Sequence, residues 1–130
     1  MRTVYVNGEY LPEDQAKVSI FDRGFLMADG VYEVTSVLDG KLIAFDGHAE
    51  RLTRSMNELD MRAPATTEEL LEIHRELVQM NEIKDGLIYL QVTRGSDGDR
   101  DFAFPDPDTT APSLVLFTQA KPGLADNPAA

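Results

Sequence analysis

Cysteine is absent from this chain of 130 residues, and histidine occurs only at His48 and His74. Without cysteine, neither a disulfide framework nor a thiolate zinc site can form. Two histidines are also too few for a histidine-rich zinc site, so we predict no metal centre.

Basic residues are scarce, because 12 Lys+Arg stand against 23 Asp+Glu and the net charge is −11. Nucleic acids and anionic membranes both select a basic surface, so we predict neither as a partner. The composition is typical of a soluble cytoplasmic protein with a solvated acidic surface. Long apolar runs are missing as well, so we expect neither a signal peptide nor a membrane span.

Short extended runs separated by turn residues predict two β-hairpins. Asn-Gly and Asp-Gly favour tight turns, because both central positions need a positive φ. The predicted arms and turns are Thr3 to Val6, Asn7-Gly8 and Glu9 to Leu11, and then Val31 to Leu38, Asp39-Gly40 and Lys41 to Phe45.

Two helices and two further strands are predicted after the hairpins. The first helix begins at Asp46-Gly47-His48, and Thr66 with Glu69 forms a capping-box pattern at the start of the second. Apolar residues recur at helical spacing, at Leu52, Met56 and Leu59 and then at Leu70, Ile73 and Leu77, and the second pattern continues to Met80 or Asn81. The strands cover Leu87 to Thr93 and Ser113 to Gln119.

This order of elements predicts an α+β fold, in which a mostly antiparallel sheet is built from hairpins and two helices pack on it. We expect residues 1–119 to form this domain. Residues 120–130, AKPGLADNPAA, contain two prolines and no apolar period, so we interpret them as the start of an interdomain linker.

The segment Phe21 to Val34, FDRGFLMADGVYEV, is the least regular part of the predicted fold. Charged residues interrupt its apolar run, and Gly24 and Gly30 permit backbone angles that other residues avoid. We interpret it as a loop that delivers side chains onto a strand, which is a common place for functional residues.

Tyr32, Glu33, His48 and Arg51 form the first candidate site. Tyr32 and Glu33 point to opposite faces of a strand, while His48 and Arg51 are neighbours on a helix. We expect Glu33 to accept a hydrogen bond from His48, which in turn orients Arg51. A guanidinium held in this way suits a phosphate or carboxylate, because its planar fork donates two parallel hydrogen bonds.

Both candidate sites also have an ordinary surface explanation. For the first, the alternative is an ion-pair network on an exposed helix face, made of Glu50, Arg51 and Arg54. The second candidate is the loop from Arg94 to Pro105, RGSDGDRDFAFP, whose length and aromatic pair, Phe102 and Phe104, favour a binding loop. An acidic, solvent-exposed connection would have a similar composition.

No catalytic nucleophile is evident, since the G-x-S-x-G, P-loop and G-x-G-x-x-G motifs are all absent. The lysines each flank a turn, a proline or a strand end, at Lys17, Lys41, Lys84 and Lys121. Such places are wet, whereas a Schiff-base lysine needs a protected pocket. We therefore predict that none of these lysines is catalytic.

Three stretches in order, VYVNGEYLPEDQAKVSIFDRGFLMADGVYEV, LDGKLIAFDGHAERL and LIYLQVTRG, closely resemble the N-terminal domain of fold type IV pyridoxal-phosphate transaminases. Within that class the chain is most similar to D-amino-acid transaminases. Aminodeoxychorismate lyases and (R)-amine transaminases share much of the same pattern. The resemblance covers nearly the whole chain.

The resemblance implies a role for each candidate residue. Arg51, in the HxxRL motif, would bind the phosphate of pyridoxal 5'-phosphate, and His48 and Glu33 would brace it. Tyr32, in the DGVYE motif, would contact the substrate carboxylate. Arg100 would reach into the neighbouring subunit of a homodimer and contact the same carboxylate.

Two departures from the family pattern affect these expectations. Well-known members carry a histidine two positions after the arginine that matches Arg100, whereas this sequence has Phe102. The family's Schiff-base lysine and the partner of the pyridine nitrogen lie in a C-terminal domain, which we expect to be missing from this chain. Without that lysine, transamination by the chain alone should be negligible.

These arguments lead us to expect the N-terminal domain of a D-amino-acid transaminase. Completed by the C-terminal domain, it would move an amino group from a D-amino acid to a 2-oxo acid. Two alternatives stay open. One is a non-catalytic association module that keeps the fold, and the other is an aminodeoxychorismate lyase-type activity in the intact protein.

Overall fold

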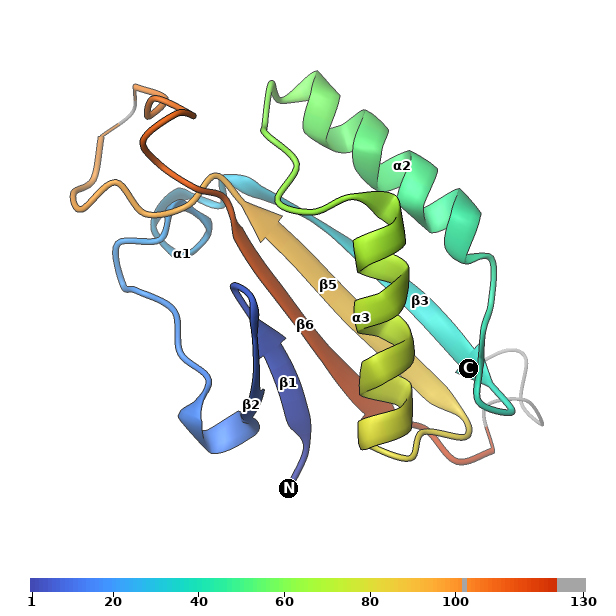
Figure 1. Ribbon diagram of the computed structural model, residues 1–130. Helices are drawn as coiled ribbons and strands as arrows, with labels where there is room; N and C mark the ends of the chain where they lie inside the picture. The colour runs from blue at the N-terminus through green and yellow to red at the C-terminus, as the bar shows by residue number, and fades with distance from the viewer. Residues whose placement is uncertain (102, 124–130) are drawn as a thin grey trace.

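An antiparallel sheet forms the framework of residues 1–101 and 103–123, the part of the chain that the computed structural model describes (Figure 1). The elements along the chain are β1 (Thr3–Val6), β2 (Glu9–Pro12), the 3-10 turn η1 (Glu13–Gln15), α1 (Arg23–Met27), β3 (Gly30–Leu38), β4 (Lys41–Leu42), α2 (Phe45–Glu58), α3 (Thr67–Met80), β5 (Gly86–Thr93) and β6 (Ser113–Ala120). The strands lie in the order β2-β1-β6-β5-β3-β4, and every neighbouring pair is antiparallel. The predicted α+β class is confirmed.

Both predicted hairpins form, and their turns have the predicted backbone. Asn7 and Gly8 have φ of 48° and 96°, and Asp39 and Gly40 have φ of 52° and 73°. Such paired positive φ angles match the right-handed twist of the flanking strands, which is why these residue pairs favour tight hairpins.

One face of the sheet is covered by α2 and α3, and the hydrophobic core lies between the sheet and these helices (Figure 1). Alternate strand residues point into this layer. The most deeply buried are Val37, Ile88, Leu90, Val92 and Leu116, which pack with Leu52 and Leu77 of the helices. The core therefore holds β3, β5 and β6 against α2 and α3.

The opposite face of the sheet carries no long helix among the described residues. Here the other alternate residues emerge, such as Tyr32 on β3, Tyr89 on β5 and Phe117 on β6, and their rings stack side by side. The segment from η1 through α1 runs along this side (Figure 1). This face, called the open face below, is thus partly apolar and only partly covered.

α3 begins at the predicted capping box. Thr66 Oγ1 accepts from the Glu69 N–H at 3.1 Å, and Glu69 Oε1 accepts from the Thr66 N–H at 3.0 Å. The apolar stripe ends at Leu77, because Met80 is exposed and Asn81 instead links β1 to β6 through hydrogen bonds to Thr3 and Thr118.

The predicted second arm of the second hairpin is too long, and the first long helix starts earlier than predicted. β4 covers only Lys41–Leu42, and Ala44, with φ of 56°, turns the chain into α2 at Phe45. Phe45 is buried in the helix layer, so its apolar side chain belongs to the helix. Leu59 is exposed beyond the end of α2, and Met61 takes the buried position instead.

The segment Phe21 to Val34 is not simply a loop before a strand, because it contains α1. The Asp22 carboxylate caps this short helix by accepting from the Gly24 N–H at 2.8 Å. Gly24 and Gly30 both lie in the described part of the chain, and neither has a positive φ. They are needed for close packing, because a Cβ on Gly24 would collide with Thr93 and one on Gly30 would lie 2.8 Å from the Val92 carbonyl oxygen.

The last strand runs to Ala120, one residue beyond the predicted end of the domain. Residues 124–130 of the predicted linker lie outside the described residues, as does Phe102. Within the described ranges, no helix combines the length and the apolar character needed to cross a membrane.

Candidate functional site

Glu33 is the centre of a cluster on the helix-covered side of the sheet. Its side chain leaves β3 towards α2 and the residue is 7% exposed. Arg51 donates to this carboxylate twice, from Nε to Oε2 at 2.9 Å and from Nη2 to Oε1 at 2.7 Å. His48 Nδ1 lies 2.8 Å from Oε1. The structure therefore brings together three of the predicted site residues.

The predicted order of contacts within this cluster is wrong in one respect. We expected His48 to stand between Glu33 and Arg51, but the Arg51 guanidinium lies directly on the carboxylate. The reason is geometric: His48 and Arg51 are one turn apart on the same side of α2, so both reach a carboxylate beneath them. Arg51 pairs with Glu33, and the alternative network with Glu50 does not occur among the described residues.

The protonation of the cluster follows from its contacts. Burial raises the pKa of Glu33, but the hydrogen bonds from Arg51 and His48 and the charge of Arg51 more than offset this, so the pKa lies below its ordinary value. The bonds to Glu33 raise the pKa of Arg51. Because an ionised carboxylate only accepts hydrogen bonds, His48 carries a hydrogen on Nδ1.

Arg51 keeps donors for an anion. Its side chain is 57% exposed, and Glu33 uses only the Nε and Nη2 side of the guanidinium. The N–H groups of Nη1 make no hydrogen bond within the described part of the chain. A cation oriented by a buried carboxylate, with an exposed donor group, can bind a phosphate or a carboxylate without first being ordered.

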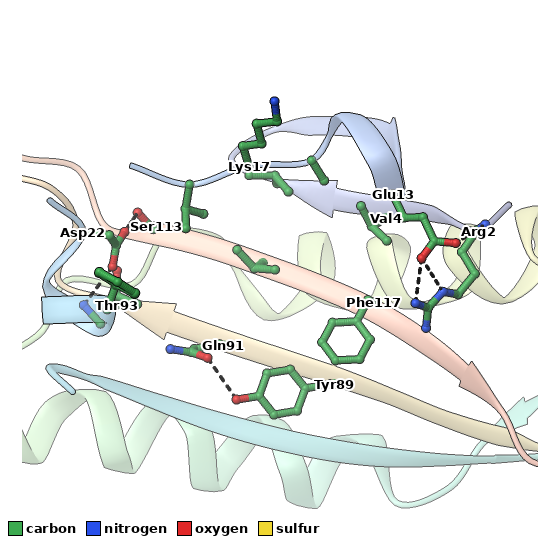
Figure 2. A pocket seen from close by; sticks show the side chains of 16 residues that line it. Arg2, Val4, Glu13, Lys17, Asp22, Tyr89, Gln91, Thr93, Ser113 and Phe117 are labelled. Atoms are coloured by element: carbon green, nitrogen blue, oxygen red, sulfur yellow. Dashed lines mark hydrogen bonds and ion pairs between the residues drawn. The ribbon is translucent and has the colours of Figure 1, made fainter. Parts of the chain in front are cut away.

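Tyr32 lies on the other face of β3, as predicted from its position next to Glu33. It is 62% exposed, and its ring stacks on Tyr89 with centroids 5.6 Å apart. Tyr89 stacks in turn on Phe117 at 5.1 Å and donates from Oη to Gln91 Oε1 at 2.9 Å (Figure 2). Tyr32 is therefore supported from one side and accessible from the other.

Tyr32 and the Arg51 cluster flank the same edge of the sheet. β4 pairs only with Val37 and Leu38 of β3. Along residues 30–35, β3 has no strand beside it on that edge among the described residues. A ligand at this edge can therefore meet Tyr32 from the open face and Arg51 from the helix-covered face.

A hollow of about 500 Å³ also lies on the open face, between the sheet and the segment that follows β2 (Figure 2). Its floor is mostly apolar, with Val4 and Phe117 among its residues. The Arg2–Glu13 ion pair lies at one end, and Ser113, which donates to Asp22 at 2.6 Å, lies at the other. The open face thus combines aromatic, apolar and polar groups.

Arg100 is exposed in the long connection between β5 and β6, and its backbone N–H donates to Asp99 Oδ1 at 2.8 Å. The structure confirms a loop here. Phe104 is 65% exposed, and its ring covers the guanidinium of Arg94, 3.9 Å from ring centroid to Cζ. Phe104 therefore has a structural partner in Arg94.

Sequence reasoning missed the cluster formed by Arg23, Asp29 and Arg94. Asp29 Oδ2 accepts from Arg23 Nε at 2.7 Å and from Arg94 Nε at 2.9 Å. The charges of Arg23 and Asp29 inside an apolar run were the available signal. The partner Arg94 is distant in sequence, so only the fold reveals the cluster.

All four lysines are exposed, in keeping with their predicted wet positions. Only Lys17 of the four borders the hollow on the open face.

The fold of this chain is similar to part of a solved aminotransferase structure. The branched-chain amino acid aminotransferase from Escherichia coli superposes on 92% of this chain with a TM-score of 0.80, at 18% sequence identity, and the match covers 41% of that protein. At this identity the likeness concerns the fold alone. It corresponds to one part of a larger aminotransferase.

Sequence comparison then establishes the family. The family model for amino-transferase class IV matches residues 30–130, and the chain belongs to this family. The D-alanine aminotransferase of Staphylococcus aureus is 42% identical over 120 residues, and that of Staphylococcus haemolyticus is 40% identical over 120 residues. Each match covers 92% of this chain and 42% of the relative, so the chain spans less than half the length of these relatives.

Proposed function

We propose that this chain is the N-terminal domain of a pyridoxal-phosphate-dependent D-amino-acid transaminase, which moves an amino group from a D-amino acid to a 2-oxo acid. The observation that carries the proposal is the Arg51 guanidinium held on Glu33, in a chain 42% identical to a D-alanine aminotransferase. The aminotransferase family and the open edge of β3 support it.

Arg51 would hold the phosphate of the cofactor. The donor set fits this group, because the guanidinium is exposed, permanently charged and already oriented by Glu33. The N–H groups of Nη1 are not used by Glu33 and can donate to the phosphate. His48 would help to keep the Glu33 carboxylate in place, because its Nδ1 bonds Oε1, the oxygen that also accepts from Arg51 Nη2. When bound, pyridoxal phosphate supplies the electron sink for the transfer.

Tyr32 and Arg100 would hold the substrate carboxylate. Tyr32 is accessible at the edge of β3, and Arg100 is exposed within the long loop between β5 and β6. We place Arg100 in the active site of a neighbouring subunit of a homodimer. Phe102 stands where well-known members of the resembled family have a histidine, so Arg100 and Tyr32 would carry more of the carboxylate binding.

A second domain would provide the covalent lysine and the partner of the pyridine nitrogen. The exposed positions of the four lysines of this chain support the first role, since a Schiff-base lysine must lose its proton in a protected pocket. We further propose that the protein works in the cytoplasm, consistent with its acidic composition and lack of cysteine.

The phosphate role of Arg51 is testable on the chain itself. We expect pyridoxal 5'-phosphate to shift the NMR signal of the Arg51 Nε–H group, and pyridoxal without phosphate to shift it much less. Arg51→Ala should weaken the binding of pyridoxal 5'-phosphate at least about tenfold, because a charge-assisted bond to phosphate is lost. The matched control is Arg54→Ala, which removes an exposed arginine of the same helix. Equal weakening by both variants would contradict a specific role for Arg51.

The reaction is testable in a chimera. This chain replaces the matching segment of the Staphylococcus aureus D-alanine aminotransferase, and the product is assayed with D-alanine and 2-oxoglutarate. We expect amino transfer that Arg51→Ala reduces strongly. Turnover of aminodeoxychorismate but not of D-amino acids would favour the lyase alternative. A folded chimera that binds pyridoxal 5'-phosphate and transfers no amino group would favour an association module.

A further inference from the structure

Two buried arginines share a single carboxylate at the base of the loop that carries Arg100. Asp29 Oδ2 accepts from Arg23 Nε at 2.7 Å and from Arg94 Nε at 2.9 Å. The side chains of Arg23, Arg94 and Asp29 are only 2%, 9% and 12% exposed. Buried arginines are rare unless they are paired and hydrogen-bonded, so each must have further partners.

Each arginine uses its other N–H groups on backbone carbonyls. Arg94 donates from Nη2 to the Leu59 oxygen at 2.7 Å and from Nη1 to the Asp60 oxygen at 3.3 Å, which ties it to the end of α2. Arg23 donates instead from Nη1 to carbonyl oxygens of the loop, at Asp101 and Ala103. Arg94 therefore anchors the cluster to the helix layer, and Arg23 extends it to the loop.

The bonds from Arg23 lie next to Arg100. The Asp101 oxygen is 2.6 Å from Arg23 Nη1, and the Ala103 oxygen is 3.2 Å from the same nitrogen. Asp101 directly follows Arg100 in the chain, so a fixed Asp101 carbonyl fixes one side of Arg100. On the N-terminal side of Arg100, Gly98 has a φ of 79°, which gives the chain a tight turn.

An aromatic ring completes this attachment. The Phe104 ring lies over both guanidinium groups, with its centroid 3.9 Å from Arg94 Cζ and 5.8 Å from Arg23 Cζ. Cation–π contacts of this kind are stronger when the cation is shielded from water. Phe104 is 65% exposed, which indicates that the ring covers the arginines rather than filling a core.

Backbone bonds hold the start of the loop to the same place. The Arg23 N–H donates to the Gly95 oxygen at 2.8 Å, and the Arg94 N–H donates to the Asp29 oxygen at 3.2 Å. Gly95 has φ of 100°, and a Cβ there would collide with the Ala111 carbonyl. The two ends of the loop are thus close together, and Arg23 reaches from this base to its middle.

We propose that Arg23 is a positioning residue, which fixes the described part of the loop between β5 and β6 at Asp101 and Ala103 and sets where Arg100 is presented. Arg23 sits on α1, shortly before the strand with Tyr32, and its side chain bonds the Asp101 carbonyl next to Arg100, so it is connected through the backbone to both groups assigned to the substrate carboxylate. This statement about the substrate rests on the proposed function. The attachment of the loop by Arg23 does not.

The charge balance shows which substitution tests this role. Removing Asp29 would leave two buried cations without their carboxylate, which threatens the fold. Removing Arg23 leaves Asp29 paired one-to-one with Arg94. Arg23→Met keeps much of the buried side-chain volume and removes the donors to the loop, so the fold is expected to survive. Arg23→Lys keeps the charge with a single donor group and should restore part of the contact.

The first experiment measures backbone motion of this chain by NMR relaxation. We expect order parameters near those of rigid backbone, about 0.85, at Asp101 and Ala103, and a fall towards about 0.6 in Arg23→Met. Arg23→Lys should give intermediate values. The signals of β5 and β6 should keep their order, and Arg54→Met on α2 should change nothing in the loop. An ordered loop in Arg23→Met, or equal loss of order in the strands, would overturn the positioning role.

The second experiment uses the chimera with D-alanine and 2-oxoglutarate. Arg23→Met should raise KM for D-alanine several-fold with a smaller change in kcat, and Arg23→Lys should recover part of the loss. If Arg23 acts through Arg100, adding Arg23→Met to Arg100→Ala should cause little further loss. Additive losses, or an unchanged KM in an active enzyme, would refute this. Absence of any D-amino-acid turnover in the parent chimera would count against the proposed function alone, because the relaxation data would still decide the attachment of the loop.

Discussion

His74 is a buried histidine that contributes to stability through its neutral form. It lies on α3, its Nδ1 is 2.6 Å from the Leu70 carbonyl oxygen, and its ring meets the edge of Phe45 at 5.0 Å. Burial lowers the pKa of His74 most strongly, the Leu70 carbonyl raises it less, and nearby His48 lowers it further, so the pKa lies below the ordinary value of 6.5. The folded protein therefore resists protonation at this position.

We expect the free energy of unfolding to fall as the pH drops below about 6.5. Above this pH both states hold neutral His74, and the full stability is present. Below it the unfolded chain binds a proton that the folded chain does not, so stability is lost until the pH reaches the lower pKa of the folded state. Urea denaturation at several pH values between 7.5 and 5 measures this loss.

Substituting His74 distinguishes its contribution to the pH dependence of stability from that of the many carboxylates. His74→Gln should lower stability at pH 7.5 but flatten its decline between pH 6.5 and 5. Arg75→Gln, at the adjacent exposed position, should leave the decline as in the unaltered protein. The same steep decline in His74→Gln would show that other groups cause it.

At the scale of the element, α3 depends on its capping box. Thr66 and Glu69 satisfy each other's backbone N–H groups, and the Thr66 N–H also lowers the pKa of Glu69. Thr66→Ala removes the acceptor for the Glu69 N–H and should lower the free energy of unfolding by about 1 kcal/mol. Urea denaturation measures it. Thr67→Ala, one position later and also exposed, is the matched control and should have a much smaller effect. Equal losses would contradict a capping role.

Elements defined by local chemistry could be predicted from the sequence, and those defined by distant contacts could not. The turns at Asn7-Gly8 and Asp39-Gly40 and the start of α3 at Thr66 each depend on a few adjacent residues. α2 begins at Phe45 because that side chain is buried against His74, which lies far along the chain. The short helix α1 likewise depends on packing of Gly24 against Thr93.

In the candidate site, too, local motifs could be predicted from the sequence and distant contacts could not. The resemblance carried by DGVYE and HAERL identified Glu33, His48 and Arg51, and the structure places them in contact. Which side chain bonds to which depends on how α2 crosses β3, and no spacing rule contains that angle. The Arg23–Asp29–Arg94 cluster joins a residue of α1, the residue before β3 and the residue after β5, so it appears only once the sheet is assembled.

For the molecule as a whole, the excess of acidic residues is the dominant electrostatic feature. The net charge is −11, and the excess negative side chains repel one another most strongly in the compact state. The two ion pairs of Asp29 are shielded from solvent, because Arg23, Arg94 and Asp29 are nearly buried. Salt therefore weakens the surface repulsion more than it weakens these pairs.

We accordingly expect added NaCl to stabilise the chain. Raising the ionic strength from about 0.01 M to about 0.15 M shortens the screening length from about 30 Å to about 8 Å, so the midpoint of urea denaturation should rise. The matched variant carries Glu9→Lys and Glu72→Lys at two exposed positions, which changes the net charge from −11 to −7 because each substitution adds 2. Its midpoint should be less sensitive to NaCl. A salt response equal in both proteins would mean that specific ion binding, rather than general repulsion, governs the effect, and a falling midpoint would mean that exposed pairs such as Arg2–Glu13 outweigh the repulsion.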